Sequence, residues 1–356
     1  MFDHDLKYMR RALELAQRGG RAVAPNPMVG AVLVHGDNVI GEGLHQKYGE
    51  AHAEVNAIRS VTAKDLHLVR ESTLYVSLEP CSHFGKTPPC ADLIIETKIP
   101  RVVVACRDPF PSVSGRGIEK LRAAGIDVTE GVLRDEALFL NRRFMTAHRE
   151  CRTYIILKWA QTRDGYIAPP AQKPFWFSSE HSRQLTHAWR AEEMAILIGS
   201  TTARVDSPQL TVRYTDLCAP ESFPIQNPLR IVIDRDDNLP ANLELFSKDA
   251  PTLIYNANVN SSSGTIIRKA LSFDSGDVPK QVCADLYQRK ILSVIVEGGR
   301  ATLQSFINAG LWDEARVFYC PIDFGAGTPA PLLHAAHPTI RDSGVDELRI
   351  YTRLPR

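Results

Sequence analysis

Apolar residues near the start of the chain recur at helical spacing. The helical positions are Leu6, Met9, Leu13 and Ala16. Because neighbouring positions are three or four residues apart, they share one face of a helix, and Gly19-Gly20 is suited to ending it. Asp3 or Asp5 can cap its first turn. The chain is therefore expected to open with one amphipathic helix.

A β-hairpin is predicted next, from an apolar run at 29–34, a polar turn at 35–38 and an extended segment that resumes at Val39. Strands and helices then alternate. The expected strands lie at 73–78 and 101–106. Two expected helices begin near His52 and near Pro89, and two more cover 115–124 and 134–147. This alternation is typical of an α/β/α sandwich.

A polar patch at 148–152 separates this pattern from a second one. The second pattern has expected strands at 154–159, 195–199, 229–234, 252–255 and 292–297, and helices near 180–190, 280–289 and 300–309. A chain of 356 residues also exceeds the length at which a single core stops growing. We therefore predict two α/β domains, residues 1–148 and 149–356, with surface loops at 219–227 and 256–264.

Charge and cysteine usage narrow the classes of function. The chain has 42 basic and 41 acidic residues, a formal net charge of +1 and no block of like charges, which argues against nucleic-acid and membrane partners. No apolar run is long enough for a membrane span, and the acidic start does not resemble a signal peptide. The seven cysteines are odd in number and scattered, unlike a secreted disulfide scaffold. These features predict a cytoplasmic protein with reduced thiols.

Four residues have the composition of a catalytic zinc site: His52, Glu54, Cys81 and Cys90. One His and two Cys supply three ligands to Zn²⁺ and leave the fourth tetrahedral position to water. Zinc lowers the pKa of bound water to about 7, so that hydroxide is available to attack a ring carbon. Glu54 is suited to moving protons from that water to the ring nitrogen and the leaving ammonia. The pattern predicts a hydrolytic deaminase.

The spacing of the two cysteines departs from the common deaminase pattern. Zinc deaminases of nucleobases carry His-x-Glu followed by Pro-Cys-x-x-Cys, whereas eight residues separate Cys81 from Cys90. A closed structural zinc site is the alternative, with His83 or His45 as its fourth ligand. Glu79 is expected to accept hydrogen bonds from backbone or from groups around the ligands rather than to bind metal.

The second half lacks the G-x-G-x-x-G fingerprint of an ordinary dinucleotide-binding domain. A strand that ends near Val296 leads instead through Glu297-Gly298-Gly299 into an expected helix, where free backbone N–H groups are suited to phosphate. A simple turn and helix cap is the alternative interpretation of this glycine pair.

Longer motifs in both halves carry a family resemblance. They are Asn26-Pro-Met-Val-Gly30, Gly41-Glu-Gly-Leu-His45, Leu78-Glu-Pro-Cys-Ser-His-Phe-Gly-Lys-Thr-Pro-Pro-Cys90, Thr162-Arg-Asp-Gly165, Trp176-Phe-Ser-Ser179, Gly199-Ser-Thr-Thr202 and Asp206-Ser-Pro-Gln-Leu-Thr-Val-Arg213. Over essentially its whole length the chain resembles the bifunctional riboflavin-biosynthesis enzymes, which join a diaminohydroxyphosphoribosylaminopyrimidine deaminase to a 5-amino-6-(5-phosphoribosylamino)uracil reductase. The resemblance implies a cytidine-deaminase-like sandwich followed by a dihydrofolate-reductase-like α/β domain.

The resemblance also implies site residues in each half. In the first half it implies zinc ligands at His52, Cys81 and Cys90, a proton shuttle at Glu54, and substrate contacts at Asn26, His45 and Lys86. In the second half it implies NADPH contacts at Gln161, Trp176, Thr202, Asp206, Gly299, Arg300, Ala301, Thr302, Leu303, Gln304 and Ser305. Substrate contacts match Arg190, Leu210, Arg213 and Glu297, and both arginines are suited to a ribose 5′-phosphate. Lys158 is a further candidate, for polarising the sugar as it opens.

The predicted activity is hydrolytic deamination of a pyrimidine ribose phosphate at zinc, followed by reduction of the ribosyl chain by NADPH. A homodimer through the reductase domain is implied by the resemblance. Two alternatives remain at this point: a nucleic-acid or nucleoside deaminase, and a zinc-stabilised protein whose second domain binds a nucleotide without turnover. The near-neutral charge argues against a nucleic-acid substrate, and the presence of Glu54 argues for chemistry.

Overall fold

The computed structural model describes residues 2–82, 88–110, 114–170, 175–218 and 225–353. The chain forms two compact units that divide between Cys151 and Arg152, where the sequence-based boundary lay at 148/149. None of the described helices has the length and apolar character needed to cross a bilayer.

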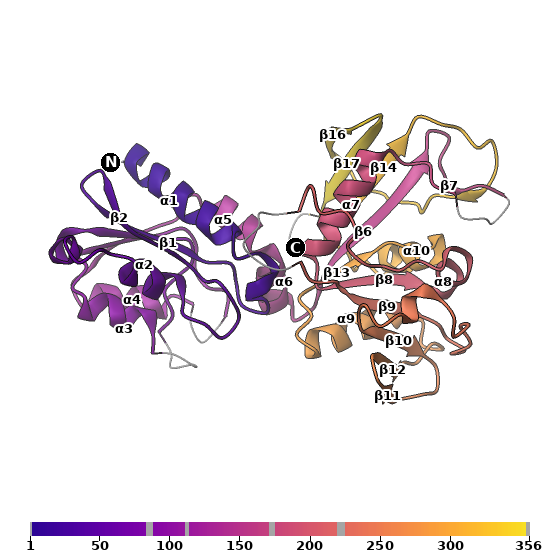
Figure 1. Ribbon diagram of the computed structural model, residues 1–356, viewed down its shortest axis with the longest axis horizontal. Coiled ribbons are helices and arrows are strands. Elements are labelled where there is room, and N and C mark those ends of the chain that lie inside the picture. Colours follow the sequence, from indigo (N-terminus) through magenta and orange to yellow (C-terminus); the bar gives the residue numbers. More distant parts are fainter. Residues whose placement is uncertain (1, 83–87, 111–113, 171–174, 219–224, 354–356) are drawn as a thin grey trace. The chain divides into compact units, whose positions relative to one another are not determined.

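The first unit is built on a sheet of five strands in the order β2-β1-β3-β4-β5, counted over the described residues (Figure 1). The strands are β1 (Gly30–His35), β2 (Asn38–Leu44), β3 (Thr73–Val76), β4 (Arg101–Val104) and β5 (Asp127–Glu130). The first two pair in antiparallel register, which confirms the predicted hairpin. The last three run parallel, so their carboxyl ends meet at one edge of the sheet.

Helices cover both faces of this sheet. They are α1 (Phe2–Gln17), α2 (Ala53–Arg59), α3 (Cys90–Glu96), α4 (Arg116–Ala123), α5 (Arg134–Leu140) and α6 (Arg142–Glu150), with short 3₁₀ turns at Gly20–Val23 and Leu66–Glu71. Apolar residues of α2, α3 and α4 pack with Leu33 and Leu74 in one core. Tyr75, one residue on from Leu74, faces the other way and lies 5.4 Å from the Tyr8 ring of α1. The predicted α/β/α sandwich is confirmed.

The helix expected over 134–147 is wrong as a single element, because it breaks at Asn141. The Asn141 side chain is buried and holds the backbone of Met28 at both polar atoms. Its Oδ1 accepts from the Met28 N–H at 2.8 Å, and its Nδ2 donates to the Met28 carbonyl at 2.9 Å. This contact spans the unit, so local periodicity carried no sign of it.

The second unit contains a mixed sheet of ten strands among the described residues, in the order β11-β12-β10-β9-β8-β13-β6-β14-β17-β16. The strands are β6 (Tyr154–Thr162), β8 (Ala195–Gly199), β9 (Leu229–Ile233), β10 (Thr252–Asn256), β11 (Ser261–Ser263), β12 (Ile266–Ala270), β13 (Ser293–Val296), β14 (Glu314–Cys320), β16 (Thr339–Ser343) and β17 (Asp346–Thr352). Strands β7 (Tyr166–Ala168) and β15 (Thr328–Pro329) form a separate pair. The loop expected at 256–264 is wrong in part, because β11 within it pairs with β12.

Helices also lie on both faces of the larger sheet. They are α7 (Glu180–Glu192), α8 (Ser200–Asp206), α9 (Val278–Gln288) and α10 (Arg300–Asn308), with a 3₁₀ turn at Glu244–Phe246. Leu286 of α9 and Phe306 of α10 pack in one core, whereas Ala203 of α8 and Trp189 of α7 pack in the core on the opposite face. This arrangement places the start of α10 directly after the carboxyl end of β13.

Candidate functional sites

Three side chains of the first unit converge into a candidate metal site. His52 precedes α2, Cys90 begins α3, and Cys81 follows the end of β3. His52 Nδ1 lies 3.3 Å from Cys90 Sγ and 3.6 Å from Cys81 Sγ, and the three ligand atoms are all within 4.8 Å of one another. A tetrahedral zinc with bonds of about 2.3 Å to sulfur and about 2.0 Å to nitrogen separates such N and S atoms by about 3.5 Å. The three donors therefore match zinc in both chemistry and spacing.

The described residues place only these three donors in the cluster. His45, one candidate for a fourth ligand, is engaged elsewhere: its Nε2 lies 3.1 Å from Asn26 Nδ2, and its Nδ1 lies 3.1 Å from the Ala51 carbonyl. His83, the other candidate, falls outside the described residues. The contacts of His45 favour a site with an open position over a closed structural one.

Glu54 lies in the first turn of α2 and is 3% exposed. Burial, followed by the charge of the neighbouring Cys81, raises the pKa of this carboxyl to about 7. A carboxyl group that exchanges its proton near neutral pH is suited to both accepting and returning a proton. Hydrogen bonds from Cys90 and His52 hold the pKa of the Cys81 thiol well below its ordinary value, which favours the thiolate that a metal requires.

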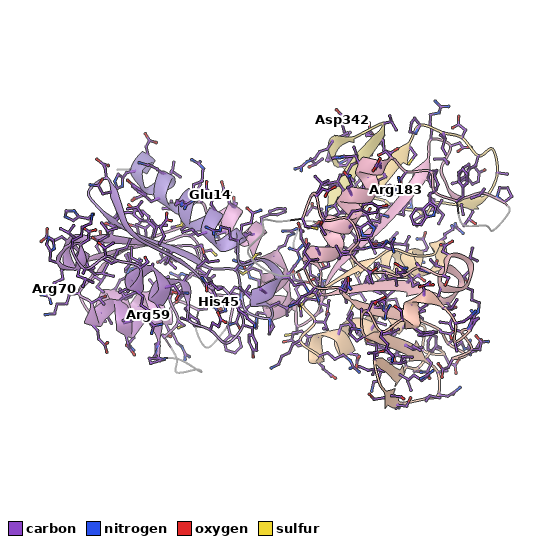
Figure 2. All side chains as sticks on the ribbon, viewed as in Figure 1. Glu14, His45, Arg59, Arg70, Arg183 and Asp342 are labelled. Carbon is purple, nitrogen blue, oxygen red and sulfur yellow. The ribbon has the colours of Figure 1, made fainter. Side chains whose placement is uncertain are left out.

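Two of the three predicted substrate contacts in this unit also meet beside the cluster. Asn26 and His45 are joined by the hydrogen bond described above, and the His45 ring packs edge-on against the His52 ring at 5.5 Å (Figure 2 labels His45). Burial lowers the pKa of His45, so its neutral form is favoured. The third predicted contact, Lys86, lies outside the described residues.

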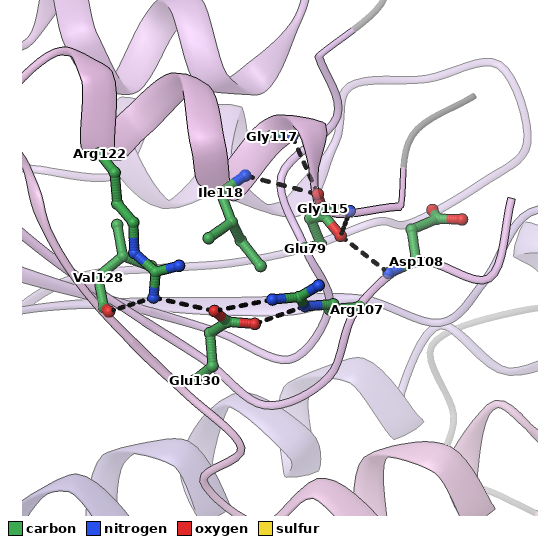
Figure 3. Close-up of polar contacts among 9 residues, drawn as sticks. All are labelled: Glu79, Arg107, Asp108, Gly115, Gly117, Ile118, Arg122, Val128 and Glu130. Carbon is green, nitrogen blue, oxygen red and sulfur yellow. Dashed lines mark hydrogen bonds and ion pairs between the residues drawn. The ribbon is translucent and has the colours of Figure 1, made fainter. Parts of the chain in front are cut away.

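Glu79 fixes the turn that carries Cys81 (Figure 3). Its carboxylate is 4% exposed and accepts hydrogen bonds from the backbone N–H groups of Asp108 at 3.2 Å, Gly115 at 2.9 Å and Gly117 at 2.9 Å. A Cβ on Gly117 would lie 2.0 Å from the Pro80 carbonyl oxygen, so the start of α4 packs closely on the same turn. The expected backbone role of Glu79 is confirmed. Its partners were not predictable, because they come from a loop and helix distant in sequence.

The second unit brings three predicted substrate residues together inside the domain. Glu297 receives two hydrogen bonds from Arg190, at 2.8 Å from Nε and 2.6 Å from Nη2, and Lys158 Nζ lies 4.0 Å away. Burial opposes the charge on Glu297, but Arg190 and Lys158 outweigh it and hold the carboxyl pKa at about 2. Burial lowers the pKa of Lys158, while Glu297 opposes that shift. The cluster therefore combines a fixed carboxylate with a lysine whose proton is easier to release.

His187 joins this cluster and was missed in the sequence. It lies three residues before Arg190 on α7, and it accepts a hydrogen bond from the Arg213 backbone N–H at 3.1 Å. Burial and the charge of Arg190 lower the His187 pKa to about 4. The sequence did carry one signal for His187: it stands three residues before Arg190, so the two side chains share a face of α7. Of the other predicted contacts, Arg213 is exposed and Leu210 is buried.

The turn after β13 brings predicted cofactor residues from two helices together. Gly299 has φ of +72°, and a Cβ there would lie 3.2 Å from Thr202 Oγ1 of α8. A Cβ on Gly199 would lie 2.5 Å from Thr302 Oγ1 of α10. The two glycines thus allow α8, α10 and the intervening turn to approach closely.

The remaining predicted cofactor residues contact different neighbours. Leu303 is 1% exposed and packs in the core. Gln304 bonds Leu332, Ser305 bonds the Thr302 carbonyl, and Gln161 accepts from Trp159. Trp176 is 70% exposed. Arg300 and Ala301 begin α10, and Asp206 ends α8.

Comparison with known protein families matches both units. Residues 3–106 match the cytidine and deoxycytidylate deaminase zinc-binding region, and residues 153–349 match the RibD C-terminal domain. The first match contains His52, Glu54, Cys81 and Cys90, and the second contains the cluster around Glu297. The families therefore agree with the division into two units.

Relatives match along nearly the whole chain. The riboflavin biosynthesis protein RibD of Aquifex aeolicus is 40% identical over 91% of this chain and 88% of its own length, and that of Escherichia coli is 38% identical over 89% and 88%. The solved diaminohydroxyphosphoribosylaminopyrimidine deaminase/5-amino-6-(5-phosphoribosylamino)uracil reductase of Thermotoga maritima is 35% identical, with a TM-score of 0.87 over 99% of each chain. The chain therefore belongs to the RibD family of riboflavin biosynthesis, as a bifunctional enzyme with a zinc-binding deaminase domain and an NADPH-dependent reductase domain.

Proposed function

We propose that the chain deaminates 2,5-diamino-6-(5-phosphoribosylamino)pyrimidin-4(3H)-one and then reduces the product, 5-amino-6-(5-phosphoribosylamino)uracil, to the ribityl compound. The observation that carries the proposal is the open cluster of His52, Cys81 and Cys90 beside the buried Glu54. The two activities named for the Thermotoga maritima relative support the choice of substrates.

In the deaminase unit, we assign His52, Cys81 and Cys90 as the zinc ligands. When bound, zinc supplies a water molecule acidic enough to attack the ring as hydroxide near neutral pH. Glu54 accepts the proton of that water and passes protons to the ring nitrogen and the leaving amino group, so the ring C–NH₂ becomes C=O and ammonia departs. Asn26 and His45 line the approach to His52 and orient the ring.

In the reductase unit, we assign Glu297 and Lys158 to the reacting end of the sugar, because they bring a fixed carboxylate and a buried lysine close together. When bound, NADPH supplies the hydride that adds to C1′ of the ribose. Lys158 donates a proton to the ring oxygen as the C1′–O bond opens, and its lowered pKa makes this transfer easier. Arg190 keeps Glu297 ionised and in place, and the exposed Arg213 is left to bind the 5′-phosphate. The turn at Gly299, with Thr202 and Thr302, receives the cofactor.

The proposal is tested by incubating zinc-loaded protein with the diaminopyrimidine ribosyl phosphate and NADPH. Ammonia release and NADPH oxidation are recorded in parallel, with a second reaction that starts from the aminouracil. We expect both signals in the first reaction and only NADPH oxidation in the second. Absence of both signals in protein with full zinc content would refute the proposal.

We further propose a cytoplasmic homodimer joined through the reductase unit. A reducing compartment is consistent with a site that needs two thiolate ligands. Strand β16 lies at the end of the ten-stranded sheet and exposes Ile340, so it offers an edge to a second copy. Light scattering after size-exclusion chromatography tests this, because a monomeric mass would contradict it.

A further inference from the structure

A cavity lies in the deaminase unit, beyond the carboxyl ends of β4 and β5. Its volume is about 240 Å³, and it shares no residue with the cluster of His52, Cys81 and Cys90. Cys106 and Arg107 follow β4, Glu130 ends β5, and Arg134, Leu138 and Arg149 come from α5 and α6. Open α/β sheets characteristically bind ligands beyond the carboxyl ends of their strands.

The single carboxylate of the cavity wall is already matched. Glu130 receives hydrogen bonds from Arg107 at 2.7 Å to Oε2 and 3.3 Å to Oε1 (Figure 3). Arg122 Nη2 lies 2.9 Å from the same Oε1. The Arg107 hydrogen bond holds the pKa of Glu130 below its ordinary value, so this carboxylate stays ionised and its charge is matched by Arg107.

Arg134 and Arg149 differ from Arg107 in this respect. Within the described part of the chain, neither forms an ion pair or hydrogen bond with another side chain. Both charges act on Cys106, which lines the cavity: burial raises the pKa of this thiol, and Arg149 and Arg134 oppose that rise. Three arginines against one glutamate leave two positive charges on the cavity wall without a counterion.

We propose that this cavity binds a small phosphate monoester through Arg134 and Arg149. A phosphate monoester carries close to two negative charges at neutral pH and accepts paired hydrogen bonds from guanidinium groups. The volume corresponds to about eight water molecules, which leaves room for a sugar-sized group beside the phosphate. Leu138 and Cys106 supply apolar surface for that group.

Arginine modification read residue by residue tests the proposal on the intact, zinc-loaded protein. The protein is treated with phenylglyoxal, and mass spectrometry follows each arginine with ribose 5-phosphate, inorganic phosphate or ribose present. Arg59 and Arg70 are exposed arginines of the same unit and serve as internal controls (Figure 2). We expect saturable protection of Arg134 and Arg149 by ribose 5-phosphate, none by ribose, and unchanged modification of the two controls.

The measurement with inorganic phosphate distinguishes a site for a sugar phosphate from a site for free phosphate. Equal protection by phosphate and by ribose 5-phosphate would overturn the sugar part of the proposal and show a site for free phosphate. Protection of neither arginine, or equal protection of Arg59 and Arg70, would overturn the site itself.

Single substitutions give an independent measurement. Arg134→Ala and Arg149→Ala should each weaken ribose 5-phosphate binding at this cavity about tenfold or more, because each removes a charged hydrogen-bonding partner. The concentration dependence of protection of the remaining arginine measures this loss. Both variants should keep wild-type zinc content, and Arg70→Ala is the matched control. Unchanged protection in both variants would overturn the proposal.

Discussion

Arg190 and Glu297 are 107 residues apart and form a two-point ion pair inside the reductase unit, at 2.8 Å and 2.6 Å. Arg190 is 8% exposed, and its remaining Nη1 lies 3.4 Å from the Thr211 carbonyl. This guanidinium was predicted as a phosphate contact, and that role stays a prediction. Its observed partners show that it first neutralises a buried carboxylate.

Removing one partner of this pair should destabilise the reductase unit. Arg190→Met leaves Glu297 buried without its two hydrogen bonds and with only Lys158, 4.0 Å away, as a counterion, which costs up to about 3–5 kcal/mol in free energy of unfolding. The double variant Arg190→Met/Glu297→Leu should recover most of this stability without recovering NADPH oxidation. Urea denaturation followed alongside turnover measures both effects, and a double variant no more stable than the single one would contradict the argument.

Glu54→Gln should remove the proton shuttle and leave the metal site intact. We expect ammonia release to fall by about 10²- to 10⁴-fold, with zinc content unchanged and the aminouracil still reduced. Glu50→Gln, at an exposed position close in sequence, is the matched control. Loss of both activities in a folded, zinc-bound variant would show that the two sites are not independent.

Metal removal should separate the two reactions. Chelation of zinc, or Cys90→Ser, should abolish ammonia release while NADPH oxidation with the aminouracil continues, because the ligands all belong to the first unit. Cys151→Ser changes an exposed cysteine outside the cluster and should affect neither reaction. Readdition of zinc should restore the chelated wild type, and failure to do so after full reloading would count against a catalytic metal.

Gly299→Ala should weaken cofactor binding beyond its cost in stability. Its φ of +72° strains any side chain, and the added Cβ would lie 3.2 Å from Thr202 Oγ1. Gly264→Ala shares the strain, with φ of +59°, but meets no atom within 4 Å. Each variant should lose about 1 kcal/mol of stability, whereas only Gly299→Ala should raise KM for NADPH. Equal KM values would remove this turn from the cofactor site.

The Asp5–Arg101 pair should stabilise the deaminase unit in a pH-dependent way. Hydrogen bonds from Arg101 lower the pKa of Asp5 from its ordinary 3.8. A carboxyl whose pKa is lowered by folding contributes its stability above the unfolded pKa and loses it as the pH falls through the folded one. The stability difference between wild type and Asp5→Asn, measured by calorimetry, should therefore shrink below about pH 4. Asp3→Asn, at an exposed position, should show no such change.

Local pattern was sufficient for many of the elements, although it missed strands β14, β16 and β17, and it was not sufficient for the contacts between elements. The hairpin of β1 and β2 and the start of α10 follow from turn chemistry and periodicity that lie within a few residues. The break at Asn141 depends on Met28, and the ion pair of Arg190 depends on Glu297, so neither has a local signature. Ligand residues were predictable because metal chemistry restricts their types. The hydrogen-bond donors to Glu79 were not predictable, because any backbone N–H group can donate to a carboxylate.

The contact between Asn141 and Met28 determines where the deaminase can be cut from the rest of the chain. Met28 follows Asn26 closely in the loop that meets His45, and both of its backbone polar groups are held by a side chain near the end of the unit. A fragment that stops before Asn141 would lose this tie and release the active-site loop, although His52, Cys81 and Cys90 would all still be present. An independent deaminase must therefore extend past Asn141, and the compact unit itself ends at Cys151.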